Sequence, residues 1–246
     1  MSGTDVLPKR NFVPARRSRR LAAAAVGLVF LVLFDVDGTL LLTHDEVYVA
    51  ANRDALLAVW GSAPEGPDVP GDTALAHTRR ALRGADFTED QIGAGLDRWC
   101  ATFSGRYVEL LDDADTSHWL IPADAAETLA RVERRALLTG NPEPVARARL
   151  RRLQLDDLFA ENQGAFGCER EDRVELFGLA RARAGGWPAE RTVAVGDTPL
   201  DVRSAHAAGA RCIALTTGAY GAEDLADAEI VIGALADLPE ALASLG

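Results

Sequence analysis

Lysine is nearly absent from this sequence of 246 residues, because Lys9 is the only lysine among its 26 cationic side chains. A site built from the remaining chain has only arginine and histidine as basic groups. Mechanisms that need a lysine Schiff base or a tunable amine are therefore excluded for the folded part of the chain.

Cysteine is scarce as well. Cys100, Cys168 and Cys212 are widely spaced, and the sequence has no C-x-x-C pair. This usage predicts neither a disulfide framework nor a zinc site, and it is typical of proteins in a reducing compartment such as the cytoplasm. We expect Cys168 to be a small, buried apolar residue.

Positive charge is deficient overall, with a formal net charge of −11. Residues 1–20 contain six of the 26 basic and one of the 37 acidic residues, so the remainder has 20 basic against 36 acidic residues, a net of −16. This balance argues against nucleic acid as the main partner. It is compatible with an acidic site that binds a divalent cation.

A single long apolar run, Leu21 to Phe34, follows the basic segment "RRSRR". As a helix this run would span about 21 Å, less than the ~30 Å hydrocarbon core of a bilayer. We predict that residues 1–28 form a basic, disordered extension before a buried strand, and that no membrane is a partner. A secretion or anchoring signal is the alternative, and a misassigned start codon would also explain such a tail.

The rest of the chain divides into two patterns. The continuous apolar run at 28–36 predicts a central strand, and 44–120 contains only helical signals, at 44–60, 72–82 and 88–111. After that, strand and helix signals alternate. The strands are expected at 135–140, 164–167, 191–197, 211–218 and 228–235, and the helices at 123–134, 142–159, 170–184, 200–210 and 238–245.

Repeated strand–helix units predict an α/β protein with a Rossmann-like, doubly wound parallel sheet. The core domain would comprise residues 29–43 and 121–246, and residues 44–120 would be an inserted all-helical cap domain. Ligands of such sheets bind beyond the carboxyl ends of the strands.

Polar side chains stand at several of these strand ends. Asp35 and Asp37 are two residues apart and therefore share one face, while Thr139 and Asp197 end two other strands and Asp201 follows in the next helix. Carboxylates that converge raise each other's pKa values unless a cation neutralises them. Oxygen ligands with open coordination positions suit Mg²⁺, which we expect as the cofactor.

These residues lie in the segments "DVDGTL", "LLTGN" and "GDTPLD", with a basic residue at the start of a helix between the last two. The four segments resemble, in order, the four motifs of the haloacid dehalogenase superfamily. The resemblance covers residues 29–246, and the helical insertion resembles that family's C1-type cap.

The resemblance implies a role for each of the motif acids. Asp35 would be the nucleophile that forms an aspartyl-phosphate, and Asp37 would act as general acid and then as general base. Asp35, the backbone carbonyl of Asp37 and Asp197 would bind Mg²⁺, with Asp201 in support.

The resemblance also implies a phosphate-binding set. Thr139, Gly140 and Asn141 would hydrogen-bond the phosphoryl oxygens, and Arg173 would neutralise their charge, with Arg170 as the alternative. Three further residues are candidates for substrate or phosphate binding: Gly38, Thr39 and His44.

The family comparison thus predicts a Mg²⁺-dependent phosphatase for a small phosphorylated metabolite, similar to the phosphoglycolate phosphatase branch. A phosphosugar mutase of the same superfamily and a non-catalytic binding protein that keeps the fold are alternatives. Asp37 disfavours a dehalogenase, and the lack of a cap lysine disfavours a phosphonatase. The sequence does not specify the oligomeric state.

Overall fold

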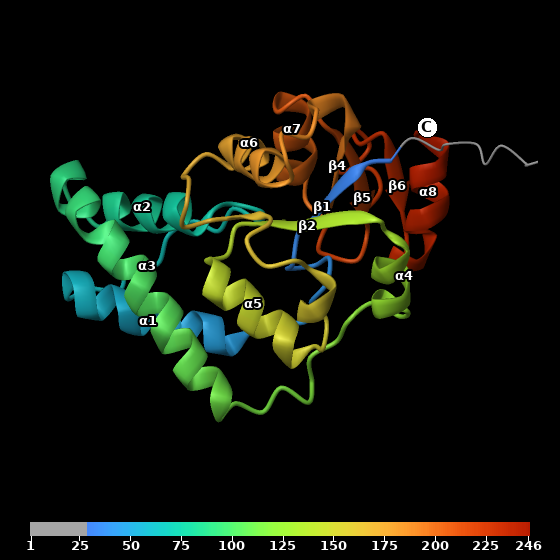
Figure 1. The fold of residues 1–246 in the computed structure, drawn as a ribbon. Helices are drawn as coiled ribbons and strands as arrows, with labels where there is room; N and C mark the ends of the chain where they lie inside the picture. Colours follow the sequence, from blue (N-terminus) through green and yellow to red (C-terminus); the bar gives the residue numbers. More distant parts are fainter. Residues whose placement is uncertain (1–28) are drawn as a thin grey trace, which may run out of the picture.

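The structure, a computed structural model, describes residues 29–246 and places six parallel strands of this part of the chain in one sheet. The strand order is β3-β2-β1-β4-β5-β6 (Figure 1). The strands are β1 (Leu31–Phe34), β2 (Arg134–Thr139), β3 (Ala165–Phe166), β4 (Thr192–Gly196), β5 (Arg211–Leu215) and β6 (Ile230–Ile232). The predicted α/β class and parallel sheet are confirmed. The prediction for residues 1–28 lies outside the described residues.

Helices cover both faces of the sheet (Figure 1). Three of them, α1 (Glu46–Trp60), α2 (Ala74–Gly84) and α3 (Glu89–Asp112), follow β1 and are here called the helical insert. The others are α4 (Ala125–Arg131), α5 (Glu143–Arg152), α6 (Arg173–Arg183), α7 (Pro199–Ala207) and α8 (Leu238–Ser244). Among the helices of residues 29–246, none has the length and apolar character that a membrane crossing requires.

Strand β1 explains why the first apolar run has no alternation of polar residues. Leu31 and Leu33 belong to the core cluster that contains side chains of α6 and α7. Val32 and Phe34 belong to the opposite cluster, with side chains of α4, α5 and α8. Because both faces of this strand are covered, each of its positions is apolar and buried.

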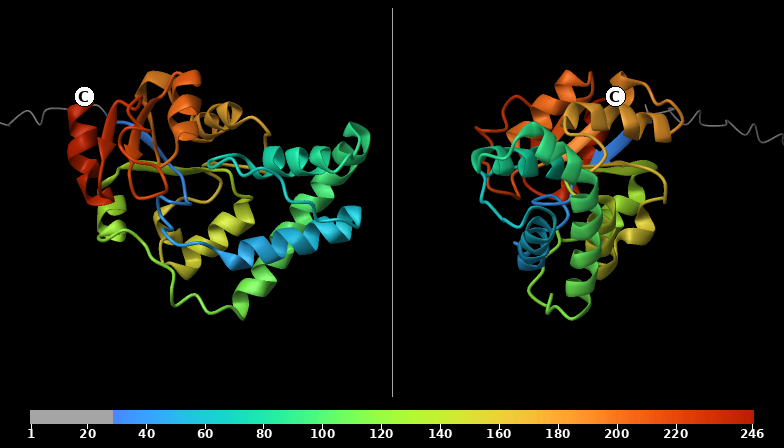
Figure 2. Two further views of the ribbon diagram at one scale, coloured as in Figure 1. Left: turned by 180° about the vertical axis from the view of Figure 1, so that it is seen from behind. Right: turned by 90° about the vertical axis from the view of Figure 1, so that its left-hand side faces the viewer.

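The helical insert packs beside the carboxyl end of the sheet, and the left view of Figure 2 shows it at the opposite end of the molecule from α8. Helix α3 begins at a capping box in which Thr88 and Gln91 exchange hydrogen bonds, as the Thr-Glu-Asp signal predicts. Its buried side chains Trp99, Phe103 and Tyr107 form the apolar face that packs toward α1. Within residues 44–120 the structure has helices and loops and no strand.

The insert also touches the core through the start of α2. The amide of Ala74 donates to the carbonyl of Gly140 (2.8 Å), and the amide of Leu75 donates to that of Gly167 (3.2 Å). The hydroxyl of Thr73 donates to the carbonyl of Glu171 (2.7 Å). These bonds hold the insert against the loops that follow β2 and β3.

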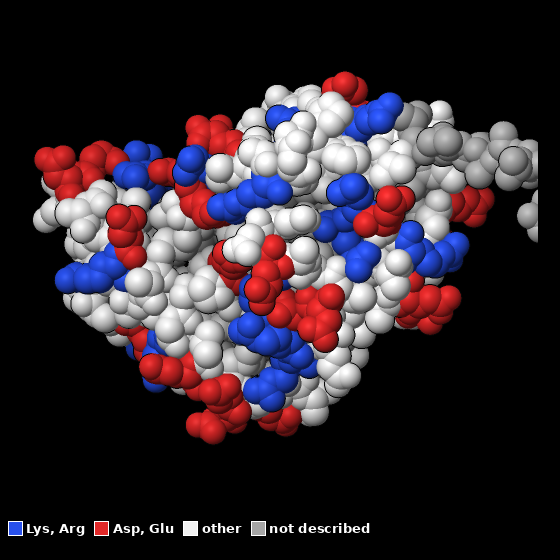
Figure 3. All heavy atoms as spheres, viewed as in Figure 1, with Lys and Arg blue, Asp and Glu red and all other residues white. Residues whose placement is uncertain are grey.

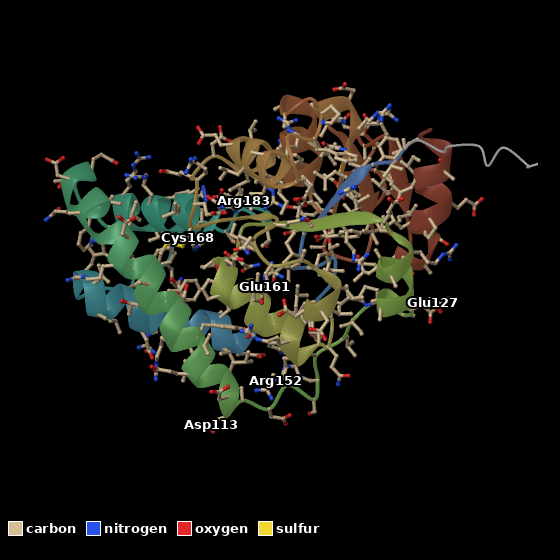
Figure 4. All side chains as sticks on the ribbon, viewed as in Figure 1. Asp113, Glu127, Arg152, Glu161, Cys168 and Arg183 are labelled. Carbon is tan, nitrogen blue, oxygen red and sulfur yellow. A yellow bond between two sulfur atoms is a disulfide. The ribbon has the colours of Figure 1, made fainter. Side chains whose placement is uncertain are left out.

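The cysteine prediction is wrong for two of the three residues. Cys100 of α3 and Cys168, which follows β3, form a disulfide, with Cα atoms 6.2 Å apart. Cys168, labelled in Figure 4, is partly buried at the junction of insert and core. The two cysteines are 68 positions apart, and only the packing of the insert on the core brings them together. Cys212 is a free, buried thiol on β5.

Removal of this disulfide should lower the free energy of unfolding. The closed loop spans 68 residues, for which loop-closure entropy predicts about 4 kcal/mol. In denaturant titrations, the double variant Cys100→Ser, Cys168→Ser should unfold at a lower midpoint than wild type. A reductant should shift the wild-type midpoint and leave that of the double variant unchanged. A wild-type midpoint that is unchanged by the reductant would contradict the pairing of Cys100 with Cys168.

Helix α5 is shorter than predicted. The apolar spacing predicted a helix over 142–159, but α5 ends at Arg152 and is followed by a 3₁₀ turn at Asp156–Leu158. Gln154 has φ +60°, which interrupts the helix. The apolar pattern nevertheless continues, because Leu155 and Phe159 are buried in the core.

Candidate active site

A pocket of about 510 Å³ lies at the carboxyl ends of β1, β2 and β4, between the sheet and the helical insert. Because these strands are parallel neighbours, the residues that follow them converge at one edge of the sheet. Its lining includes most of the candidate residues: Asp35, Asp37, Gly38, His44, Thr139, Gly140, Asn141, Arg173 and Asp197. Thr39 and Asp201 lie directly behind them through hydrogen bonds described below.

Three carboxylates form the acidic centre of the site. Asp35, Asp197 and Asp201 each offer an oxygen, and these oxygens lie within 4.8 Å of one another. All three side chains are buried. Asp201 is the third residue of α7, where its carboxylate accepts hydrogen bonds from the amide (3.0 Å) and hydroxyl (2.7 Å) of Thr198. A helix cap therefore fixes one of the three acids.

Burial and mutual repulsion shift the protonation of this cluster. Burial raises the pKa of Asp35 to about 7; the neighbouring Arg173 acts in the opposite direction, and Asp201 adds to the rise. Burial, Asp35 and Asp201 raise the pKa of Asp197 to about 8. Because burial and neighbouring carboxylates keep Asp35 and Asp197 from ionising, a bound cation would allow both to be charged together.

The surroundings of the cluster fit such a cation. The donors are carboxylate oxygens, which hard divalent ions such as Mg²⁺ prefer. Gly38 and Gly218 lie so close to the carboxylate of Asp197 that a Cβ atom on either would overlap it. Gly38 has φ +70°, which side chains rarely adopt. Glycine at both positions therefore lets the carboxylate of Asp197 lie directly against the backbone.

Arg173 supplies the positive charge at the cluster. It is the first residue of α6 and is buried, and its Nη2 lies 2.5 Å from Asp201 and 3.5 Å from Asp35. Burial alone would lower its pKa, but Asp201 and Asp35 raise it overall. Its Nε is buried and finds no hydrogen-bond partner within residues 29–246.

Arg170, the alternative cation, is exposed. It donates to the carbonyl of Glu169 (2.6 Å) and pairs with Glu175 (3.3 Å). The structure therefore brings Arg173, and not Arg170, to the strand-end acids.

Asn141 holds Asp37, which also lines the pocket. The side-chain amide of Asn141 donates to Oδ2 of Asp37 (2.7 Å) and to the hydroxyl of Thr139 (2.9 Å). Thr139 and Asn141 are buried, whereas 55% of the Asp37 side chain is exposed to the pocket. The second acid of the "DVDGTL" segment is therefore held at the surface of the cavity.

The remaining candidates take different positions. Thr39 is buried and its hydroxyl donates to Asp197 (3.3 Å). The carbonyl of Gly140 accepts a hydrogen bond from the amide of Ala74 in the insert. His44 is exposed at the rim of the pocket, directly before α1.

Sequence reasoning missed Arg149 on α5. Its side chain is 2% exposed and its Nη1 lies 3.0 Å from both carboxylate oxygens of Asp37. Its Nε donates to the buried Asp45 (2.8 Å), the N-cap of α1. Position 149 follows the buried Val145 by four residues, so helical periodicity places it on the core face. This spacing in the sequence could have indicated that Arg149 faces the core.

The comparisons with known proteins agree with this geometry. The family model of haloacid dehalogenase-like hydrolases matches residues 31–209. Phosphoglycolate phosphatase 1 of Pseudomonas aeruginosa is 30% identical over 224 residues, which cover 87% of this chain and 80% of that protein.

Two solved structures share the fold. A predicted phosphoglycolate phosphatase from Haemophilus somnus superposes with a TM-score of 0.58 at 22% identity, covering 88% of this chain and 99% of that one. β-Phosphoglucomutase from Clostridium difficile gives a TM-score of 0.62 at 15% identity, covering 88% and 97%.

The chain belongs to the haloacid dehalogenase-like hydrolases, in the phosphoglycolate phosphatase-like branch. The predicted family and enzyme class, a phosphatase of this family, are therefore confirmed.

Proposed function

We propose that this protein is a Mg²⁺-dependent phosphatase that hydrolyses a small phosphomonoester through an aspartyl-phosphate on Asp35. The observation that carries the proposal is the convergence of Asp35, Asp197, Asp201 and Arg173 at a pocket that Asp37 also lines. Phosphoryl transfer depends mainly on positioning and on neutralisation of charge, and this arrangement can supply both.

In the first step, a carboxylate oxygen of Asp35 attacks phosphorus in line with the departing ester oxygen. Arg173 and the hydroxyl of Thr139 bind the phosphoryl oxygens, and the unpartnered Nε of Arg173 is available as a donor. Asp35, the backbone carbonyl of Asp37 and Asp197 would hold Mg²⁺, with Asp201 in support. When bound, the cation neutralises negative charge on the phosphoryl group and orients it.

Asp37 handles the protons of both steps. It donates a proton to the departing alkoxide and then accepts one from the water that hydrolyses the aspartyl-phosphate. The hydrogen bond from Asn141 holds one of its oxygens, Arg149 lies 3.0 Å from both, and the side chain lines the cavity. We propose residues 44–120 as the cap that excludes bulk water during this sequence, over a core of residues 29–43 and 121–246.

The substrate is proposed to be a small phosphorylated metabolite. A cavity of about 510 Å³ under the insert suits such a molecule better than a phosphoprotein. Relatives named phosphoglycolate phosphatase make phosphoglycolate the first substrate to try. The cytoplasmic location stays a prediction, and the disulfide removes cysteine usage as an argument for it.

The test is hydrolysis of phosphoglycolate and of an aryl phosphate by metal-free protein, with and without added Mg²⁺. We expect turnover that requires the cation and releases inorganic phosphate. With a sugar phosphate as substrate, transfer of the phosphoryl group to a second hydroxyl of the sugar, without net phosphate release, would instead identify the mutase alternative. Folded wild-type protein without turnover of either ester would favour the binding-protein alternative.

A further inference from the structure

A single buried arginine connects Asp37 with the helical insert. Arg149 lies on α5, which belongs to neither the insert nor the strand-end loops. Only 2% of its side chain is exposed, although a guanidinium is costly to remove from water. Its contacts must therefore compensate for that cost.

On the core side, Arg149 and Asn141 clamp the Asp37 carboxylate together. Nη1 of Arg149 lies 3.0 Å from each oxygen of Asp37 and 3.1 Å from Oδ1 of Asn141. The amide of Asn141 completes the triangle by donating to Asp37 (2.7 Å). Although half exposed, the Asp37 side chain is therefore held in one orientation from two directions.

On the insert side, the same guanidinium is held by α1 and α3. Its Nε donates to Asp45 (2.8 Å), and the hydroxyl of Tyr107 on α3 donates to the same oxygen of Asp45 (2.7 Å). The guanidinium carbon lies 4.8 Å from the ring centroid of Tyr48 on α1 and 5.7 Å from that of Tyr107. Distances of this size are typical of cation–π contacts.

We propose that Arg149 is a positioning residue for the phosphatase reaction: it orients Asp37 toward the ester oxygen and ties that orientation to the packing of the helical insert over the pocket. This inference rests on the proposed function, in which Asp37 donates the proton to the leaving group. Arg149 itself does not need to touch the substrate, because it acts through Asp37.

A comparison of two phosphate esters can distinguish this positioning role from a purely structural one. An alkyl phosphate needs a correctly placed proton donor for its leaving oxygen, whereas para-nitrophenyl phosphate has a leaving group that departs without one. Loss of the orientation of Asp37 should therefore slow formation of the aspartyl-phosphate selectively for the alkyl ester, whereas hydrolysis of that intermediate is the same step for both esters. General acid catalysis contributes about 10²–10⁴-fold, which sets the scale of the effect.

The experiment measures kcat/KM for phosphoglycolate and para-nitrophenyl phosphate in wild type, Arg149→Gln and Asp37→Asn. This parameter covers the reaction up to release of the alcohol or phenol and excludes the later hydrolysis of the aspartyl-phosphate, which is the same for both esters. In Arg149→Gln we expect a loss of about 100-fold on the alkyl ester and less than about tenfold on the aryl ester. In the Asp37→Asn background, Arg149→Gln should add no further discrimination between the esters, because the two residues act as one unit.

Arg147 provides the matched control. It is a buried arginine on the same helix, but it donates to Asp156 (3.2 Å) and to the carbonyls of Phe159 (3.0 Å) and Ala160 (2.9 Å). Arg147→Gln should therefore change both kcat/KM values by the same factor. Tyr107→Phe removes only the hydroxyl that donates to Asp45, and it should shift the ester ratio in the same direction as Arg149→Gln. If Arg149→Gln does not fold, Tyr107→Phe replaces it as the test variant.

Two outcomes would overturn the proposal while leaving the phosphatase function intact. One is an equal loss on both esters in Arg149→Gln, and the other is the same discrimination in Arg147→Gln. An unchanged ester ratio in Tyr107→Phe would overturn the link to the insert. Folded wild type that hydrolyses neither ester would contradict the proposed function and, with it, this role.

Discussion

Replacement of Asp35 with asparagine is expected to reduce kcat by about 10⁴-fold or more, because it removes the nucleophile and leaves the rest of the site in place. The two side chains have the same shape, and Asp35 is buried with its oxygen 3.5 Å from Arg173. Steady-state hydrolysis of an aryl phosphate in the presence of Mg²⁺ measures the loss. The aryl ester is chosen because its departure does not depend on Asp37.

Two controls accompany this variant. Asp113→Asn changes an exposed acid at the end of α3, far from the pocket (Figure 4), and should retain wild-type kcat. The thermal midpoint of Asp35→Asn should be at least that of wild type without metal, because a neutral amide replaces a buried acid whose pKa is raised. An Asp35→Asn enzyme that keeps substantial activity would contradict the assignment of the nucleophile.

Metal-free wild type is expected to lose several kcal/mol of stability as the pH rises from about 5 to 8. In the folded protein, the pKa values of Asp35 and Asp197 are raised to about 7 and about 8. The unfolded chain releases these protons near pH 4, so in this window the folded state binds more protons than the unfolded state. Stability must therefore fall as the pH rises.

The difference between wild type and Asp197→Asn isolates this effect from other titrating groups. Unfolding free energies from denaturant titrations in chelator should show a flatter pH profile for Asp197→Asn, and Asp113→Asn should follow wild type. Mg²⁺ should stabilise wild type, and more strongly at pH 8 than at pH 5, because a cation binds the deprotonated ligands. A wild-type profile that rises between pH 5 and 8 and parallels that of Asp197→Asn would contradict the acidic cluster.

The surface charges add little to the dependence of the unfolding free energy on pH. On the face shown in Figure 3, acidic and basic side chains alternate over the surface rather than form a region of one sign. Exposed pairs of this kind contribute about 0–1 kcal/mol each and are screened by salt. The buried acids of the site should therefore dominate the pH profile in the window between 5 and 8.

The strand-end acids could be predicted because their positions follow from local pattern. A continuous apolar run identifies β1, and Asp35 and Asp37 must then stand at its carboxyl end. The same logic places Asp197 after β4 and Arg173 at the start of α6. Parallel neighbouring strands bring such residues together without any knowledge of the side-chain packing.

Arg149 and the disulfide could not be derived in this way. The contact between Arg149 and Asp37 joins residues 112 positions apart, and it depends on how α5 packs against the helical insert. Cys100 and Cys168 meet for the same reason, because α3 lies against the loop after β3. The end of α5 was missed because Leu155 and Phe159 continue the apolar pattern after Gln154 has left the helical conformation.

The most direct test of the central claim is mass spectrometry of the acid-quenched Asp37→Asn enzyme after brief reaction with para-nitrophenyl phosphate and Mg²⁺. This variant can form the intermediate, because the aryl group leaves without a proton, but it lacks the base that activates water for its hydrolysis. We predict that one phosphoryl group accumulates on the peptide that contains Asp35. A phosphoryl group on another residue, or product formation without a phosphorylated enzyme, would contradict the mechanism.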